Sequence, residues 1–241
     1  MIFEHDFEIG VKDVGKNDMI KNRAIIEMLE DIGSYHSDLV HYGINDIPTT
    51  NVAWILLTWK LKVIDRPKYG EKLHVKTWGK NMTKVFTYRD FEIYDENNKL
   101  CIIATSRWAL IDVRTRRMAK LNDDIIQSFK PENKDVFENP KIEKIKIPSS
   151  YSNTFKYKTT RRDIDINGHM HNLYYLDIAY NALPDDVYYN KRPFDNVEIE
   201  YKKEIKLDDN LICKYSFENN KHIIAIYNED ETILHSIISL Y

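Results

Sequence analysis

The pattern that most constrains this fold is an order of elements that occurs twice along the chain. In residues 19–42, apolar side chains recur three and four positions apart, which predicts an amphipathic helix with one buried side. Residues 50–115 then alternate apolar and polar side chains with the period of two that is typical of half-buried strands. The second half repeats this order, with a helix at 170–183. Four strands are predicted to follow it, at 195–205, 210–217, 221–228 and 231–240.

A helix followed by an antiparallel sheet, present twice, indicates a tandem α+β protein. In the first half, the β-rich runs 84–94 and 100–111 are joined by a short polar turn, which predicts a long hairpin. Residues 131–150 are rich in Lys, Glu, Asn and Pro and are predicted to be a linker. The expected organisation is therefore one domain at 1–130 and a second at 151–241. In each domain a long helix would be wrapped by an antiparallel sheet.

Composition excludes several classes of function. The net charge is −3, which argues against a nucleic-acid binder that relies on bulk positive charge. Only seven of the 241 residues are glycine, and we find no phosphate-binding glycine loop. No apolar run is long enough to span a membrane, and Met1–Asp6 has no basic or apolar leader pattern, so no secretory signal is expected. Cys101 and Cys213 form no metal-binding spacing, so a reduced cytoplasm is the expected compartment.

The densest polar cluster precedes the second helix. Asp165, Asn167 and His169 occupy alternate positions, so in an extended segment their side chains would share one face. The start of a helix favours nearby negative charge, including a developing oxyanion. Capping of the helix and an ordinary structural histidine are the alternative interpretations. His169 and His171 could also share a metal, but the spacing shows no third protein ligand, so no metal or other cofactor is expected.

These residues belong to a longer run that resembles a known family. Asp163–Tyr175 is similar to the pattern D-x-D-x-N-x-H-x-N-N-x-x-Y of the plant and bacterial acyl-[acyl carrier protein] (acyl-ACP) thioesterases. Residues 199–204 match the E-Y-[RK]-[RK]-E of the same family. In the first half the resemblance continues at Trp78 and at residues 89–95, 106–108 and 115–120.

The resemblance implies a tandem hotdog fold that hydrolyses the thioester of fatty acyl-ACP in fatty acid biosynthesis, with catalysis in the C-terminal half. Carried over residue by residue, the resemblance implies a catalytic site made of Asp165, Asn167, His169 and Glu204. It leaves open which of Asp165, His169 and Glu204 is the general base or the nucleophile. Since no leader precedes Phe3, a bacterial cytoplasmic member is expected.

The chain departs from the family pattern at two positions. Some accounts place a cysteine nucleophile directly after the glutamate, where this chain has Ile205. Cys213, further along the predicted strand, is interpreted as a small buried hydrophobe. His171 stands where the family usually has Asn.

The repeat gives an internal test of this site. With the helices aligned at an offset of 150, His169 falls opposite Met19, and Asn167 falls opposite Asn17. With the strands aligned at an offset of 138, Glu204 falls opposite Arg66. The N-terminal domain is therefore expected to be non-catalytic and to bind the acyl chain. The candidate lining residues, each of which could equally belong to an ordinary core, are Ile25, Met28, Leu29, Trp54 and Trp59.

The expected partner is an acidic acyl carrier protein bearing a phosphopantetheine-linked acyl chain, which calls for a basic docking surface. The candidate docking residues are Arg114, Arg116, Arg117 and Lys120. A homodimer is a further possibility, and the sequence does not indicate the preferred chain length. Two alternative functions stay open: a hotdog-fold acyl-thioester dehydratase or hydratase, and a non-catalytic acyl-thioester binding protein.

Overall fold

The computed structural model describes residues 1–80, 82–83 and 85–241. By its internal contacts the chain divides into two compact units, Met1–Ile142 and Glu143–Tyr241. We call them unit 1 and unit 2 and describe each by itself.

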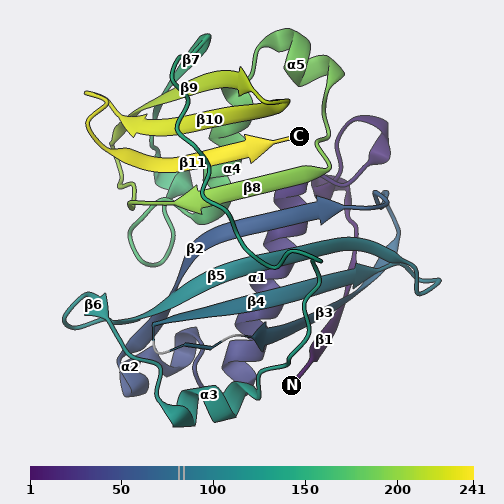
Figure 1. Cartoon of the computed structure of the whole chain (residues 1–241), viewed down its shortest axis with the longest axis vertical. Coiled ribbons are helices and arrows are strands. Elements are labelled where there is room, and N and C mark those ends of the chain that lie inside the picture. The colour runs from purple at the N-terminus through teal and green to yellow at the C-terminus, as the bar shows by residue number, and fades with distance from the viewer. Residues whose placement is uncertain (81, 84) are drawn as a thin grey trace. The chain divides into compact units, whose positions relative to one another are not determined.

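Unit 1 is an antiparallel sheet with a long helix on one face (Figure 1). Its strand order is β1-β3-β4-β5-β2, with β6 added to β5. The strands are β1 (Phe3–Glu8), β2 (Val52–Val63), β3 (Lys72–Lys80), β4 (Phe86–Tyr94), β5 (Leu100–Asp112) and β6 (Arg117–Met118). The helices are α1 (Asn22–Leu39), α2 (Ile47–Thr50) and α3 (Asp123–Phe129), and short 3-10 turns span Val11–Asp13, Lys16–Asp18 and Ile44–Asp46.

Unit 2 repeats this plan with shorter elements. Its strand order is β8-β11-β10-β9-β7, all antiparallel, and α4 packs on β10 and β11. The strands are β7 (Asn153–Lys158), β8 (Asn196–Tyr201), β9 (Asn210–Glu218), β10 (Lys221–Asn228) and β11 (Leu234–Leu240). The helices are α4 (Asn172–Asn181) and α5 (Asp185–Asn190), preceded by a 3-10 turn at Arg161–Asp163.

The predicted α+β class and tandem hotdog plan are confirmed, with differences at the ends of elements. The helix expected at 19–42 spans Asn22–Leu39, and the one expected at 170–183 ends at Asn181 and is only ten residues long. Lys84, the first residue of the run expected at 84–94, lies outside the described residues.

Each unit also begins with an edge strand that the sequence did not predict. Most side chains of β1 and β7 are exposed or half-buried, so these strands carry little of the apolar alternation that predicts a strand. Their pairing partners are β3 in unit 1 and β9 in unit 2.

The core of unit 1 lies between α1 and the sheet. Ile25, Leu29 and Ile32 on α1 and Trp59 on β2 are fully buried. Burying a large apolar side chain contributes about 1.5–3 kcal/mol relative to leaving it exposed. The three- and four-residue spacing on α1 and the alternation on β2 therefore form this core together. A second cluster, around Leu110, Leu121, Ile125 and Phe129, packs α3 against the far end of the sheet.

The first part of the segment predicted as a linker is attached to unit 1. Trp78 Nε1 donates to the carbonyl oxygen of Lys134 over 3.1 Å, and the backbone N–H of Val136 donates to Asp90 over 3.0 Å. The Lys80 ammonium lies 2.7 Å from the fully buried Asp90 carboxylate. Although this segment is rich in Lys and Asn, it packs against unit 1, because it forms hydrogen bonds with buried polar groups of the sheet.

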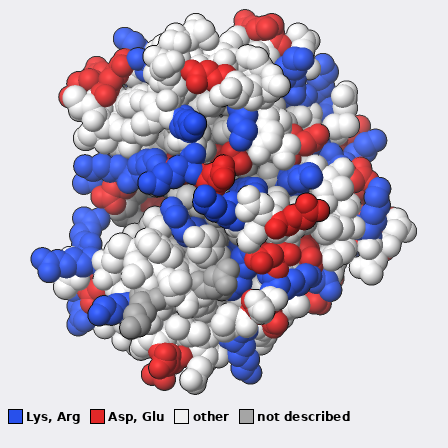
Figure 2. Space-filling model, viewed as in Figure 1, with Lys and Arg blue, Asp and Glu red and all other residues white. Residues whose placement is uncertain are grey.

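Charges on the surface are mixed. Lys and Arg are interspersed with Asp and Glu over the face shown in Figure 2, as a net charge of −3 would suggest. Among the described residues, no helix is both long and apolar enough to cross a lipid bilayer.

Candidate active site

The segment around Asp165 is a tight turn, so the expectation of an extended segment is wrong. The backbone N–H of Gly168 donates to the carbonyl oxygen of Asp165 over 3.1 Å, and that of Asp165 donates to the carbonyl oxygen of His169 over 2.8 Å. Gly168 has φ +77°, a left-handed conformation that side chains disfavour. Asp165, Asn167 and His169 therefore lie close together because the chain turns, and not because alternate side chains of a strand share one face.

The Asp165 carboxylate holds this turn in shape. Its Oδ1 accepts the backbone N–H of Asn167 at 2.8 Å and that of His169 at 3.3 Å, and its Oδ2 accepts the Asn167 side-chain amide at 3.3 Å. Both carboxylate oxygens are thus used within the turn. Asp residues commonly stabilise turns by bonding to backbone N–H groups further along.

The structure brings Glu204 to His169 from a different part of the chain. His169 Nε2 lies 3.1 Å from Glu204 Oε2. The two backbones are joined at this point, because His169 forms a β-bridge with Lys206 and the N–H of Met170 donates to the carbonyl oxygen of Ile205 over 2.8 Å. The His169 side chain is 21 % exposed and the Glu204 side chain 43 % exposed. An imidazole and a carboxylate in contact at a partly exposed position can bind a water molecule and move a proton.

Asp163 anchors the start of the turn from inside the protein. Its buried carboxylate accepts the Tyr157 hydroxyl at 2.7 Å and both the backbone N–H and the hydroxyl of Thr160. Burial by itself would raise the pKa of Asp163, but these hydrogen bonds outweigh it and lower the pKa. Because Asp13 occupies the same position in unit 1, we interpret this aspartate as part of the repeated scaffold.

His171, the departure from the family pattern, begins the helix. Its Nδ1 accepts the backbone N–H of Leu173 at 3.3 Å, as an Asn cap would. Among the residues that the structure describes, no three His, Cys, Asp or Glu side chains form a group that could hold a metal ion.

Unit 1 contains the same backbone framework, which confirms the predicted alignment of the two halves. Gly15 N–H donates to Met19 O over 2.9 Å, as Asp165 does to His169. Ile20 N–H donates to Pro67 O over 3.0 Å, as Met170 does to Ile205. Met19 bridges Lys68 just as His169 bridges Lys206.

The side chains on this shared framework differ between the units. The positions of Asp165, His169 and Glu204 are held in unit 1 by Gly15, Met19 and Arg66. Arg66 donates to the carbonyl oxygen of Ile20 and to the Asn22 side chain, which gives it a structural role. The imidazole–carboxylate pair is therefore present in only one of two otherwise similar loops.

Both cysteines are free thiols buried in strands. Burial raises the pKa of Cys213 to about 12, so the thiol is protonated at neutral pH. Ile205, which stands where a cysteine nucleophile has been assigned in the family, is fully buried. A thiolate mechanism has no residue to use at either position.

The candidate acyl-binding residues of unit 1 lie in its two apolar clusters. Ile25, Met28, Leu29 and Trp59 are buried in the main core. Trp54 is half-buried and meets Phe129 edge to face, with the ring centroids 5.7 Å apart. A β-bulge between Leu56 and Thr58 lies between the two tryptophans on β2. Their role in binding an acyl chain stays a prediction.

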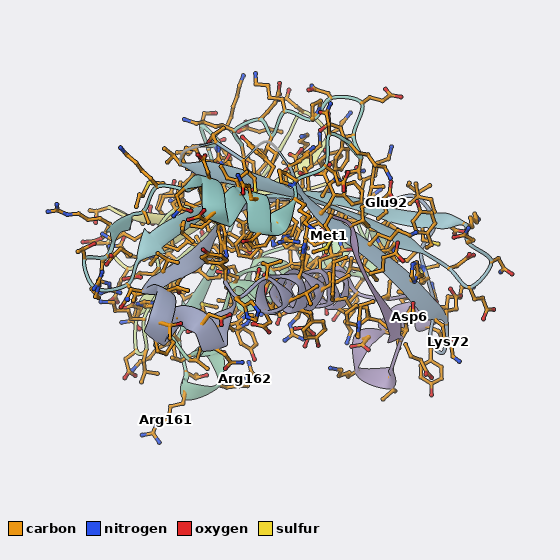
Figure 3. The ribbon with its side chains drawn as sticks, turned by 90° about the horizontal axis from the view of Figure 1, so that it is seen from below. Met1, Asp6, Lys72, Glu92, Arg161 and Arg162 are labelled. Carbon is orange, nitrogen blue, oxygen red and sulfur yellow. The ribbon has the colours of Figure 1, made fainter. Side chains whose placement is uncertain are left out.

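The candidate docking residues are all exposed. Arg114, Arg116 and Arg117 lie on or beside the β5–β6 turn, with Lys120 just beyond it. Arg161 and Arg162, which precede the turn that contains Asp165, are also exposed, and Arg161 projects away from the ribbon (Figure 3). Docking at the β5–β6 turn stays a prediction.

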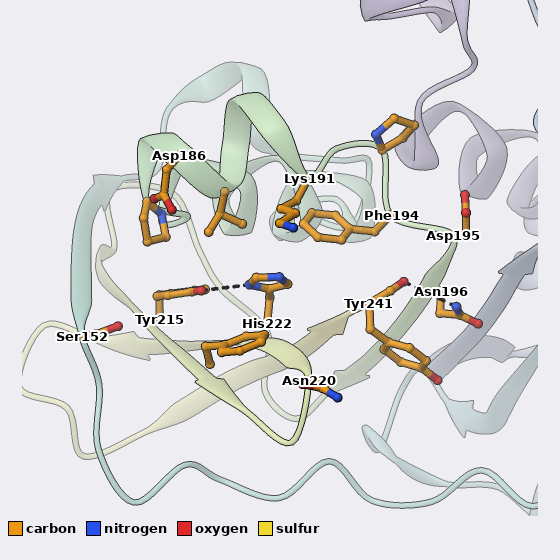
Figure 4. Close-up of a pocket in the computed structure, with 14 residues that line it drawn as sticks. Ser152, Asp186, Lys191, Phe194, Asp195, Asn196, Tyr215, Asn220, His222 and Tyr241 are labelled. Atoms are coloured by element: carbon orange, nitrogen blue, oxygen red, sulfur yellow. Dashed lines mark hydrogen bonds between the residues drawn. The ribbon is translucent and has the colours of Figure 1, made fainter.

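One pocket in unit 2 was not foreseen from the sequence. It encloses about 790 Å³ between α5 and the ends of β9, β10 and β11, and Asp165, Asn167, His169 and Glu204 are not among its lining residues (Figure 4). The Tyr215 hydroxyl lies 2.8 Å from His222 Nδ1 on its wall. Burial, together with the charge of Lys191, lowers the pKa of His222. The sequence gives no indication of this pocket, because the aromatic residues that line it come from several separate elements.

The corresponding place in unit 1 is filled. By strand register, His222 opposite Phe217 corresponds to Arg89 opposite Gly79. There the Arg89 guanidinium donates to His36 Nδ1 and lies 5.7 Å from the centre of the Phe129 ring. In unit 1, Phe129 of α3 therefore fills the place that corresponds to the pocket found among the described residues of unit 2.

Comparison with known proteins agrees with this architecture. A crystal structure of an acyl-ACP thioesterase from Bacteroides thetaiotaomicron superimposes with a TM-score of 0.89 at 23% identity, covering 99% of this chain and 96% of that one. A 12:0-ACP thioesterase from Umbellularia californica gives a TM-score of 0.87 at 17% identity, covering 99% and 96%. At these identities the likeness establishes the fold.

Sequence relatives give the family. The chain is 23% identical over 226 residues to a chloroplastic oleoyl-acyl carrier protein thioesterase of Arabidopsis thaliana, covering 86% of this chain and 61% of the relative. It thus spans about three fifths of the length of that curated relative. The family model for the acyl-ACP thioesterase N-terminal domain matches residues 1–129, and that for the C-terminal domain matches residues 147–239. The chain belongs to the acyl-ACP thioesterase family.

Proposed function

We propose that the protein hydrolyses the thioester bond of fatty acyl-ACP, releasing a free fatty acid and the carrier thiol. The contact between His169 Nε2 and Glu204 Oε2 supports this proposal most directly. It is partly exposed, and the matching positions of unit 1 hold Met19 and Arg66 instead.

The proposed reaction needs an activated water and a stabilised oxyanion. Glu204 accepts a proton from water while the hydroxide oxygen bonds to the thioester carbon, with His169 holding the carboxylate in place. The resulting tetrahedral oxyanion is stabilised by hydrogen-bond donors, for which the Asn167 amide and backbone N–H groups at the start of α4 are the candidates. The C–S bond then breaks, and the carrier thiolate leaves and takes up the proton.

We assign Asp165 a positioning role in this scheme. Its two oxygens accept three hydrogen bonds from Asn167 and His169, which lowers its capacity to attack a carbonyl carbon. Removing the carboxylate would release the turn that carries both residues. Unit 1 has Gly15 at this position and is proposed to contribute the acyl-chain site of the domain at 1–130.

Thiol release from acyl-ACP substrates of different chain lengths tests the proposed activity. Stoichiometric free acid and carrier thiol would support hydrolysis, and the profile would give the chain-length preference. Formation of a new double bond would instead indicate a dehydratase. Binding of acyl-ACP with no thiol released would indicate a binding protein. Coenzyme A thioesters in the same assay show whether the carrier protein is needed.

We place the reaction in cytoplasmic fatty acid biosynthesis, where a reducing environment would keep both buried cysteines as thiols. A homodimer is a separate prediction that light scattering of the purified chain would check.

Carrier docking is proposed at the β5–β6 turn, because an acidic partner needs exposed cations. Reversing the charge of Arg116 and Arg117 to Glu is expected to raise KM for acyl-ACP several-fold and to leave kcat unchanged. The effect should shrink as salt is added, since exposed charges are screened over about 10 Å at 0.1 M. Equal charge reversal at Lys12 and Lys16, exposed cations in another turn of unit 1, serves as the control. An unchanged KM would place docking elsewhere.

A further inference from the structure

The segment that carries Glu204 is held to the sheet in the same way as its counterpart in unit 1. The N–H groups of residues 202–203 both donate to the carbonyl oxygen of His235, over 2.8 and 3.2 Å. In unit 1 the N–H groups of residues 64–65 both donate to the carbonyl oxygen of Cys101, over 2.8 and 3.1 Å. On the side of the sheet, the two segments are therefore anchored alike.

On the side of the helix, the anchoring side chain differs. In unit 1 the Arg66 guanidinium donates to the carbonyl oxygen of Ile20 over 3.0 Å and to Oδ1 of Asn22, the first residue of α1, over 2.9 Å. We call such a side-chain hydrogen bond, from the end of the strand or the residues just after it to the start of the helix, a helix anchor. Glu204 holds the position of Arg66 in unit 2 and has no N–H group to donate, so it cannot form the same anchor.

Tyr201 forms the helix anchor in unit 2. It is the last residue of β8, and its hydroxyl donates to the carbonyl oxygen of Asn172, the first residue of α4, over 3.2 Å. Its ring meets that of Tyr175, in the first turn of α4, edge to face, with the centroids 5.3 Å apart and the planes at 87°. Edge-to-face contact is a favoured arrangement of two aromatic rings. The hydroxyl and the ring together hold the start of α4 to a residue three positions before Glu204.

Unit 1 has neither of these groups at the equivalent positions. The strand offset of 138 places Val63 opposite Tyr201, and the helix offset of 150 places Ile25 opposite Tyr175. Both are aliphatic, so unit 1 has no hydroxyl and no ring pair there. Each unit thus has a helix anchor at the same place, formed by Arg66 in unit 1 and by Tyr201 in unit 2.

We propose that Tyr201 is a positioning residue that takes in unit 2 the anchoring role of Arg66, which leaves position 204 to the carboxylate that contacts His169. This inference deepens the proposed function and rests on it for the kinetic part of the test. The anchor fixes the first turn of α4, whose N–H groups are candidate oxyanion donors, against the segment that carries the proposed base. A misplacement of about 1 Å between such groups can cost up to a hundredfold in rate.

Tyr201→Phe removes the hydroxyl and keeps the ring. We expect kcat for acyl-ACP to fall between about fivefold and a hundredfold, with KM within twofold, because the reacting groups are displaced while the acyl site is untouched. Tyr227→Phe is the matched control. Tyr227 is also a half-buried strand residue of unit 2, and its hydroxyl lies 3.1 Å from that of Tyr151. This variant should keep kcat within twofold. Equal losses in the two variants, or no loss in Tyr201→Phe, would overturn the proposal.

A swap of anchors tests the shared role without any turnover. Tyr201→Phe should lower the melting temperature by about 2–4 °C, the shift expected for one lost hydrogen bond in a chain of this size. Glu204→Arg supplies at position 204 the side chain that unit 1 has there. Its effect on the melting temperature should be more favourable in the Tyr201→Phe background than in the wild type, by about the same 2–4 °C. An equal effect of Glu204→Arg in both backgrounds would contradict the shared role.

The two parts of the test separate the possible failures. If the wild type released no thiol from any acyl-ACP, the proposed function would fail, while the melting temperatures would still decide whether Tyr201 is the anchor. Coupling between the two positions with an unchanged kcat in Tyr201→Phe would mean that the anchor serves stability only, which would overturn the positioning role.

Discussion

Glu204→Gln is expected to lower kcat for acyl-ACP hydrolysis by about 10²- to 10⁴-fold, the usual contribution of a general base. The amide keeps the size of the side chain and can still meet His169 Nε2, which lies 3.1 Å from the carboxylate. It cannot accept a proton from water. Since Glu204 is 43 % exposed, we expect the melting temperature to change little. Single-turnover thiol release measures the loss directly.

Glu231→Gln is the control for this substitution. Glu231 is 44 % exposed and pairs with the Lys214 ammonium, so it matches Glu204 in exposure and in having a cationic or imidazole partner. The Glu231→Gln variant should hydrolyse acyl-ACP at the wild-type rate. If Glu204→Gln kept more than a tenth of the wild-type kcat, the base would have to be sought elsewhere, with Asp165 as the first alternative.

His169→Ala is expected to cost a comparable factor by a different route. The imidazole contacts the Glu204 carboxylate, and its loss removes the contact that we propose holds this carboxylate at the reacting position. The backbone bonds of His169 to Asp165 do not involve the side chain, so the turn and the bridge to Lys206 should persist. We expect a loss of at least a hundredfold in kcat with a fold unchanged by circular dichroism.

Unit 1 supplies a matched control at the equivalent position. Met19, like His169, is half-buried and bridges a lysine on the facing segment. Met19→Ala should leave kcat within about twofold. Similar losses in Met19→Ala and His169→Ala would show that both loops matter only for folding and would contradict the assignment of catalysis to unit 2.

The double substitution adds a test of coupling. If Glu204 and His169 act as one unit, the double variant should lose little more than either single variant, because residues that work together are not additive. Fully additive losses would mean that the two side chains act in separate steps.

Some features follow from local sequence because they depend on local periodicity. The spacing of Ile25, Leu29 and Ile32 predicts a helix with one buried side, and all three are fully buried. The alternation around Trp59 likewise predicts strand β2 of unit 1. The two offsets, 150 and 138, correctly pair His169 with Met19 and Glu204 with Arg66, because the loops of the repeat kept their lengths.

Other features were decided only by tertiary structure, because they depend on contacts between distant segments. His169 and Glu204 lie 35 residues apart, and only the bridge between their loops brings imidazole and carboxylate to 3.1 Å. Asp165 closes a turn that alternation alone would have predicted as extended. The residues of the candidate site were thus identified by the sequence, whereas their geometry required the fold.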